Sequence, residues 1–175
     1  WYLRNLGVFG SIMSPAGSRA LWVTSYEETF IYPASTLTMD SWLASGWDEI
    51  FNVRWWAFTN NIQTVIAAQG HLILFPFIAG AMFLLRKDRR VQMGILAWVL
   101  LFLVMTFIFP FAGVRGSFFH AGAALQPLLW ALTPYSLESV VAWARKKGRF
   151  TEHAYVVFRI ALVQIVLMLS VWVVW

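Results

Sequence analysis

The sequence lacks cysteine and has few charged residues. Its 175 residues include no Cys, and only 12% are Asp, Glu, Lys or Arg. Without thiols the chain cannot form disulfide bonds, cysteine-bound zinc sites, iron-sulfur clusters or covalently attached c-type haem. Soluble domains carry about 25% charged residues, so the shortage of charge argues against a soluble domain.

Apolar and aromatic side chains are in excess instead. Hydrophobic residues make up 60% of the chain, aromatic residues 18%, and 11 residues are Trp, with a mean hydropathy of +0.67. This composition excludes intrinsic disorder, because disordered segments combine low hydrophobicity with high charge. It is typical of proteins that cross a membrane several times. We therefore predict an all-α integral membrane protein.

The basic residues are clustered in two short loops. The net charge of +5 reflects 13 basic and 8 acidic residues, and eight of the basic ones lie in RKDRR (86–90) and RKKGR (145–149). Both clusters separate long apolar runs, as cytoplasmic loops do under the positive-inside rule. A nucleic-acid groove would need basic residues spread along one face. No nucleic-acid partner is therefore expected.

Four apolar runs are long enough to be membrane spans, at about residues 62–85, 91–113, 117–144 and 155–175. The first gives about 36 Å of helix at 1.5 Å per residue, against a hydrocarbon core of about 30 Å. The third contains Pro127 and Pro134 and is expected to be kinked. With both basic loops in the cytoplasm, the chain would be a multi-pass protein of the bacterial cell (inner) membrane, and residues 1–61 would be extracytoplasmic.

Residues 1–61 carry five of the eight acidic residues. They open with Trp and lack the basic start and apolar core of a signal peptide, so we expect a processed product or part of a longer protein. From Thr38 the pattern becomes amphipathic, which predicts an interfacial helix, broken near Ser45 and Gly46, that leads into the first span. Its expected anchors at the headgroup level are Trp42, Trp47, Trp55 and Trp56.

Polar residues inside the spans are the candidates for function. Gln69, His71 and Gln126 are expected to form hydrogen bonds between helices, because unpaired polar groups are costly in hydrocarbon. His71 and His120 lie about nine and three residues into their spans, a difference of about 9 Å in depth at 1.5 Å per residue. A shared haem needs two imidazoles at similar depth. We expect no cofactor, no metal and no catalytic residue.

The turn between the second and third spans is a candidate anion site. Arg115 lies between Gly113 and Gly116, and Ser117 is a suitable N-cap for the following helix. The positive end of that helix, Arg115 and His120 are expected to converge at the outer headgroup level. They would bind a lipid phosphate or a carboxylate of a partner subunit. The alternative is an ordinary interfacial arginine that contacts headgroups.

Several segments resemble one family of membrane enzymes. The start WYLRNLGVFG is similar to the PWxxRNxxxFG segment of bacterial multi-pass glycosyltransferases of the GT-C class, which include protein O-mannosyltransferase-like enzymes. The match is carried by Trp1, Arg4, Asn5, Phe9 and Gly10. The stretch YPASTLT (32–38), residues 109–132 and the closing RKKGR also resemble the C-terminal part of such proteins. The resemblance implies sugar transfer from a polyprenyl-phosphate donor at the outer face.

In that family the catalytic acidic residue lies in an outer loop after the first span. The 175 residues of this sequence contain no counterpart of that loop. We therefore expect a non-catalytic transmembrane scaffold or accessory subunit of a larger membrane complex, for instance an energy-transducing one, with glycosyltransferase-like ancestry. Its expected partners are membrane lipids and other transmembrane subunits. The alternative is the C-terminal membrane portion of a polyprenyl-phosphate-sugar-dependent glycosyltransferase. A transporter is less favoured because no inverted repeat is visible.

Overall fold

The computed structural model is all-helical over the residues that it describes, as the sequence predicts. The described residues are 1–12, 17, 19–25, 27–30, 34–110, 118–148 and 151–174. The side chains of 152 and 172–174 are not described. These described residues form no strand. The chain divides into two compact units. Unit 1 contains Trp1–Gln63 and Val99–Ala121, and unit 2 contains Thr64–Trp98 and Gly122–Trp175.

Unit 1 begins with helix α1 (Tyr2–Phe9), which carries most of the motif at the start of the chain. Gly10 ends the helix with φ +67°, and its N–H donates to the carbonyl of Leu6. The buried Asn5 donates through Nδ2 to the carbonyl of Ile12 at 3.1 Å. The Arg4 guanidinium lies 5.6 Å from the centroid of the Trp1 ring. These motif residues therefore cap the helix and attach the following chain to it.

Three short 3₁₀ helices lead to α3 (Met39–Ala44) and α4 (Trp47–Thr64); they are Ala20–Trp22, Glu27–Phe30 and Ala34–Thr36. Thr38 caps α3, because its hydroxyl accepts from the Ser41 N–H at 3.1 Å and the Ser41 hydroxyl accepts from the Thr38 N–H at 3.0 Å. The two helices are separated by Ser45 and Gly46, and Gly46 has φ +85°. The break in the amphipathic segment lies where the sequence predicts it.

The first predicted span is not one continuous helix. The helical path of α4 passes through a π-helical turn, Val65–Gln69, and then bends between Gly70 and Leu74 before α5 (Phe75–Leu84) begins. The single helix predicted for residues 62–85 is therefore corrected to two helical segments joined by a bend. Helix α4 runs across residue 61, so the amphipathic segment continues into the first predicted span without a helix end.

Backbone conformation explains why the helix stops there. His71 and Leu72 have φ +47° and +48°, in the left-handed region that non-glycine residues rarely adopt. A Cβ on Gly70 would lie only 2.8 Å from the Cβ of Phe75, so the bend brings these two residues together. Pro76 lies in the first turn of α5, where its missing N–H is not needed. Hydropathy alone does not reveal the bend, because the residues that form it are mostly apolar.

In unit 2, α5 packs along α9 (Gln126–Lys146) through small residues. A Cβ on Gly80 would lie 2.6 Å from the Oγ of Ser136, so the two helices are very close at this point. Ala81 is fully buried and packs with Val91 and Leu132. Small residues such as these let two helix backbones approach closely.

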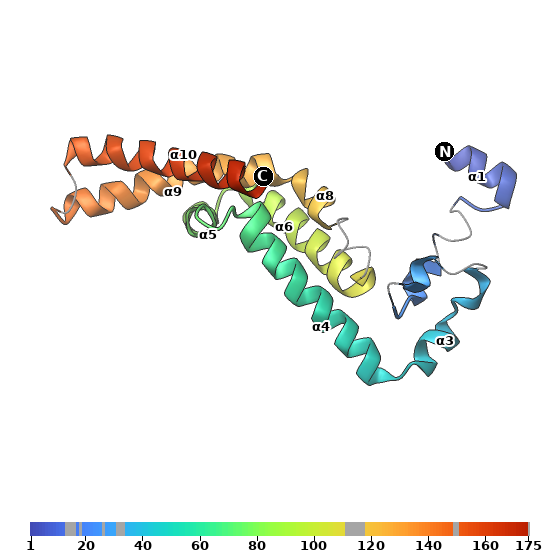
Figure 1. Ribbon diagram of the computed structural model, residues 1–175. Helices are drawn as coiled ribbons and strands as arrows, with labels where there is room; N and C mark the ends of the chain where they lie inside the picture. The colour runs from blue at the N-terminus through green and yellow to red at the C-terminus, as the bar shows by residue number, and fades with distance from the viewer. Residues whose placement is uncertain are drawn as a thin grey trace. The chain divides into compact units, whose positions relative to one another are not determined.

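Two stretches are long and apolar enough to cross a membrane, judged by length and composition. They are Arg89–Ile108, which comprises α6 (Arg89–Leu103) and a π-helical turn (Val104–Ile108), and His153–Val171 within α10 (Glu152–Val174). The third predicted span, 117–144, contains two helices instead of one, α8 (Phe118–Ala123) and α9. In Figure 1, α9 and α10 run side by side, and Leu162 of α10 packs against Leu137 of α9.

The left-handed residues at the bend provide a test of strain. We expect Leu72→Gly to stabilise unit 2 by about 0.5 to 1 kcal/mol, because relief of about 1 to 2 kcal/mol at φ > 0 exceeds the extra freedom of glycine in the unfolded chain. Leu72 is 59% exposed, so little packing is lost. The measurement is the free energy of unfolding in mixed detergent micelles.

The matched control is Leu96→Gly, which removes a similarly exposed leucine (51%) from the middle of α6. Its helical φ offers no strain to relieve, so this variant should lose about 0.5 to 1 kcal/mol. If both glycine variants destabilise the protein equally, the bend stores no strain.

Candidate functional site

A buried glutamine connects three helical segments of unit 2. Gln69, at the end of the first π-helical turn, is 2% exposed. Its Oε1 accepts from the Nε1 of Trp98 on α6 at 2.8 Å, and its backbone carbonyl accepts from the Nε1 of Trp130 on α9 at 2.9 Å. The Nε2 of Gln126 donates to the carbonyl of Ala68 at 3.2 Å. We call Gln69, Trp98, Gln126 and Trp130 the glutamine junction.

The junction satisfies backbone carbonyls that the bend leaves without helical partners. The last carbonyls of a helix have no intrahelical donor, and an unpaired carbonyl costs several kcal/mol where water is excluded. Side chains of Gln126 and Trp130 take the place of the missing N–H groups at Ala68 and Gln69. The junction therefore allows the helix to end inside a packed region.

Gly122 of α8 provides the room for the Gln69 amide. A Cβ on Gly122 would lie 1.9 Å from the Nε2 of Gln69, so any larger residue would displace the amide. The hydrogen bond from Trp98 fixes which end of the amide is the acceptor. Nε2 is enclosed and has no hydrogen-bond partner. This orientation therefore leaves one donor unpaired, and such a group costs about 1 to 3 kcal/mol.

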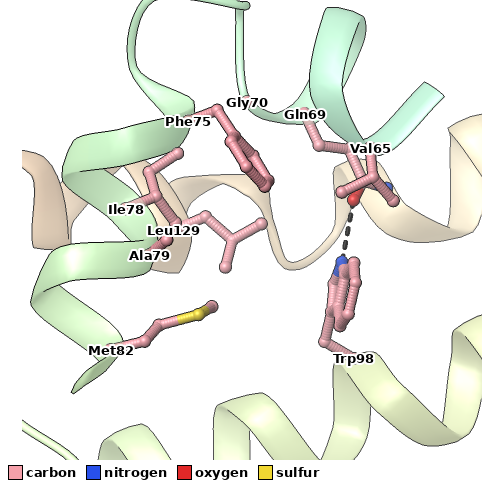
Figure 2. Close-up of a pocket in the computed structure, with 9 residues that line it drawn as sticks. All are labelled: Val65, Gln69, Gly70, Phe75, Ile78, Ala79, Met82, Trp98 and Leu129. Atoms are coloured by element: carbon pink, nitrogen blue, oxygen red, sulfur yellow. Dashed lines mark hydrogen bonds between the residues drawn. The ribbon is translucent and has the colours of Figure 1, made fainter. Parts of the chain in front are cut away.

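An apolar cavity of about 230 Å³ adjoins the junction (Figure 2). Figure 2 shows the Gln69 amide oxygen directed at Trp98, while side chains of α5 form the opposite wall. The lining residues are Val65, Gln69, Gly70, Phe75, Ile78, Ala79, Met82, Trp98 and Leu129. None of these residues is titratable, so this wall offers no general acid, general base or nucleophile.

His71 also joins two helical segments. Its Nε2 lies 2.9 Å from the Oγ of Ser170 on α10. The Ser170 hydroxyl donates to the carbonyl of Val166 at 2.8 Å, so the histidine ring donates to Ser170. Each of the three polar residues predicted for helix packing, Gln69, His71 and Gln126, therefore makes a hydrogen bond that links separate helical segments.

The predicted interfacial tryptophans belong to unit 1, where Trp42 lies at the centre of a cluster. Its ring makes edge contacts with Trp22 at 6.0 Å and Trp47 at 6.4 Å between ring centroids. The Arg54 guanidinium lies over Trp42 at 5.2 Å, and burial lowers the pKa of this guanidinium. The guanidinium remains charged at neutral pH, because arginine is effectively always protonated in proteins. The cluster therefore holds α3 against α4 with an aromatic contact to a cation.

The other predicted anchors are exposed. Trp47, Trp55 and Trp56 have exposed rings on α4, and Trp55 stacks between Phe51 and Phe58. Exposed tryptophans on one helical segment fit an interfacial location, where the ring is partly in the headgroup region.

Sequence reasoning missed the hydrogen-bonded partners of the predicted polar residues. Trp98 and Trp130 were counted as apolar residues, although each carries an N–H that needs an acceptor when buried. It also missed Asn61 in unit 1, which is buried and donates to the Oγ1 of the fully buried Thr106 at 3.1 Å. An asparagine at the edge of an apolar run was the available signal.

The candidate anion site is only partly described. Arg115, Gly113, Gly116 and Ser117 lie outside the described residues. His120 is exposed on α8 and contacts its neighbour Phe119, with ring centroids 5.5 Å apart. His71 and His120 belong to different units.

Comparisons with known proteins give no family assignment. Family models, curated proteins and solved structures were compared with the chain, and none of them matches. Within the described part of the chain, no group of three His, Asp or Glu side chains is placed to bind a metal ion.

A double-mutant cycle tests the hydrogen bond between Trp98 and Gln69. We expect Trp98→Phe to destabilise the protein by about 1 to 3 kcal/mol, because it leaves the buried amide oxygen unpaired. In a Gln69→Leu background the same change should cost much less, since both polar partners are then absent. The free energy of unfolding of the four proteins gives the coupling.

Trp55→Phe is the control for loss of an indole N–H at an exposed ring, and it should change stability by less than about 0.5 kcal/mol. A coupling near zero between positions 69 and 98 would contradict the proposed role of the hydrogen bond.

Substitution of Gly122 tests the close contact with the amide. We expect Gly122→Ala to destabilise the protein by about 1 to 3 kcal/mol through overpacking, and to cost less when Gln69 is also replaced by alanine. Gly7→Ala in α1 is the control, because a Cβ there would meet nothing within 4 Å. That variant should be neutral or more stable by up to about 1 kcal/mol. Equal effects of the two alanines would argue against a close contact at Gly122.

Proposed function

We propose that this chain is a membrane-embedded helical scaffold that takes part in a larger membrane complex. The observation that carries the proposal is the exposure of apolar side chains along α10, where Val157, Val163 and Met168 are 64%, 58% and 73% exposed. Soluble monomers rarely expose contiguous apolar patches larger than a few hundred Å². In a bilayer the same side chains would contact lipid tails without cost.

The proposed topology has four membrane segments, near residues 62–85, 91–113, 117–144 and 155–175, with the first one discontinuous. Broken helices occur in membranes where neighbouring helices satisfy the freed backbone groups, and the glutamine junction supplies such partners. The basic loops before α6 and between α9 and α10 would face the cytoplasm of a bacterial cell, and residues 1–61 the outside.

The chemistry of the junction supports a structural role. Its members are neutral amides and indoles, which fix the packing of helices but do not transfer protons at neutral pH. Helix α1 exposes apolar side chains, among them Tyr2, Leu3 and Val8. These exposed residues would serve as contacts for lipid headgroups or for the extracytoplasmic parts of other transmembrane subunits.

A second candidate is the C-terminal membrane portion of a polyprenyl-phosphate-sugar-dependent glycosyltransferase. This candidate is favoured because the residues that resemble that family have a structural role at α1. Asn5 attaches the chain at Ile12 to α1, and Gly10 caps the helix. The motif would then be a folding element shared with such enzymes, and the sugar chemistry would belong to other residues.

Single-cysteine labelling tests the topology, because the chain has no Cys of its own. We expect Lys87→Cys and Lys147→Cys to react with an impermeant maleimide only after the cell membrane is opened. Asp40→Cys should react in intact cells. Labelling of all three from the same side would contradict the proposed topology.

Sugar-transfer assays on protein from native membranes separate the two candidate functions. An antibody against these residues would isolate the protein, and its intact mass and its transfer of mannose or glucose from a polyprenyl-phosphate donor would be measured. The scaffold proposal expects no transfer, together with a reproducible crosslink to one transmembrane neighbour. A longer protein that contains these residues and transfers sugar would contradict the scaffold proposal and support the glycosyltransferase.

A further inference from the structure

A second cavity of unit 2, of about 280 Å³, lies between α9 and α10. We call it the α9–α10 groove. Its lining residues are Leu74, Trp130, Thr133, Pro134, Leu137, Glu138, Arg159, Leu162, Val163, Val166 and Leu167. In contrast to the apolar cavity at the junction, its wall includes a carboxylate and a guanidinium.

The two charged residues lie at the same end of the groove. Glu138 is eight residues before the end of α9 at Lys146, and Arg159 is seven residues after the start of α10 at Glu152. At 1.5 Å per residue both are about 10 to 12 Å from the loop that joins the helices. Farther along the helices the wall is formed mainly by apolar residues such as Val166 and Leu167. The groove is therefore polar near the basic loop and apolar toward the opposite end.

The charges are not neutralised by each other. Within the described part of the chain, no ion pair joins Glu138 to Arg159, although both line the groove. Arg159 donates to the hydroxyl of Tyr155 at 2.9 Å and lies over the Tyr155 ring at 5.3 Å, which leaves most of its five N–H donors available. The wall of the groove thus carries one cation and one anion that do not pair with each other.

A buried hydroxyl lies deeper in the groove. Thr133 is only 7% exposed, and its Oγ1 is enclosed without a hydrogen-bond partner. The following Pro134 has no N–H, so the carbonyl one turn earlier, at Trp130, loses its helical donor. Polar groups of this kind are normally paired. Because Oγ1 is enclosed, a ligand with an acceptor oxygen at this depth would pair with the Thr133 hydroxyl after rotation about χ1 turns the hydroxyl into the groove.

We propose that the α9–α10 groove binds a zwitterionic phospholipid with a primary ammonium group, of the phosphatidylethanolamine type, in the cytoplasmic leaflet. Its phosphate would pair with Arg159 and its ammonium with Glu138. An ester oxygen would accept from Thr133, and an acyl chain would lie on Val166 and Leu167. The groove is smaller than the roughly 300 to 1,000 Å³ of pockets that enclose whole ligands, so it takes only the upper part of the lipid. This assignment rests on the proposed membrane embedding.

Charge complementarity selects this lipid over its common relatives. An anionic phosphatidylglycerol would bring no cation to Glu138, and the carboxylate would repel it. The quaternary ammonium of phosphatidylcholine has no N–H to donate, so it cannot form a charge-assisted hydrogen bond with the carboxylate. Discrimination among the three headgroups is therefore the property to measure.

Lipid retention by the full chain tests the assignment. Protein purified in detergent would be equilibrated with equal amounts of phosphatidylethanolamine, phosphatidylcholine and phosphatidylglycerol with the same acyl chains, and bound lipid counted by native mass spectrometry. We expect at least about a tenfold preference for phosphatidylethanolamine, the ratio given by one charge-assisted hydrogen bond.

Each variant has its own expected pattern. Glu138→Gln should shift the preference toward phosphatidylglycerol, and Arg159→Gln should lose phosphatidylethanolamine without gaining the anionic lipid. Thr133→Val should weaken retention of all three lipids several-fold, since the ester is common to them. Glu138→Asp and Arg159→Lys keep the charges and should keep most of the preference. Asp48→Asn and Arg89→Gln, at exposed positions outside the groove, are the matched controls and should behave as wild type.

Equal retention of the three lipids by the wild type would overturn the assignment, and so would charge variants that match the controls. Variants that fold poorly are recognised by circular dichroism, and the charge-conserving pair then decides the outcome. Membrane embedding is tested separately by carbonate extraction. A chain released by carbonate contradicts the proposed function, whereas a chain that stays in the membrane without lipid preference contradicts only the groove.

Discussion

The helix end at Gln69 is the constraint on which unit 2 depends. A helix that stops inside a packed, apolar region leaves carbonyl groups that water cannot reach. The side chains of Trp130 and Gln126 supply the missing donors, and Trp98 orients the Gln69 amide. Both donors to the carbonyls come from α9 and the donor to the amide comes from α6, so both helices stabilise the bend. The backbone conformation of the bend and the packing of α6 and α9 around it therefore depend on each other.

Several unfavourable features accompany this arrangement. Two consecutive non-glycine residues, His71 and Leu72, adopt a left-handed backbone, and the Nε2 of Gln69 has no partner. Each feature costs on the order of 1 to 3 kcal/mol. They are tolerated because the hydrogen bonds from the two tryptophans and the close packing of Gly80 on Ser136 fix the surrounding helices. The strained residues thus lie together at the bend, and the contacts that hold the bend in place come from α5, α6 and α9.

The sequence predicts features that depend on local chemistry. The break at Ser45 and Gly46 follows from the glycine itself, which adopts a positive φ at that position. The importance of Gln69 follows from the cost of a polar group in an apolar run. The bend at residues 70–74 does not follow, because the donor that stabilises it comes from Trp130, 61 residues later. A hydropathy scale scores Trp130 as an apolar ring and ignores its N–H donor. Residues 62–85 are therefore predicted as one continuous span.

Helix α9 separates two spaces of different character because its faces meet different neighbours. Toward α5 it presents small residues such as Ser136, which bring the helices into close contact and leave only an apolar cavity near Leu129. Toward α10 its buried apolar contacts are fewer, centred on Leu162, and Thr133 and Glu138 line the space that remains. A wall with unpaired polar groups cannot remain dry and empty at low cost. The loosely packed side of α9 is therefore the side where a bound lipid would complete the fold.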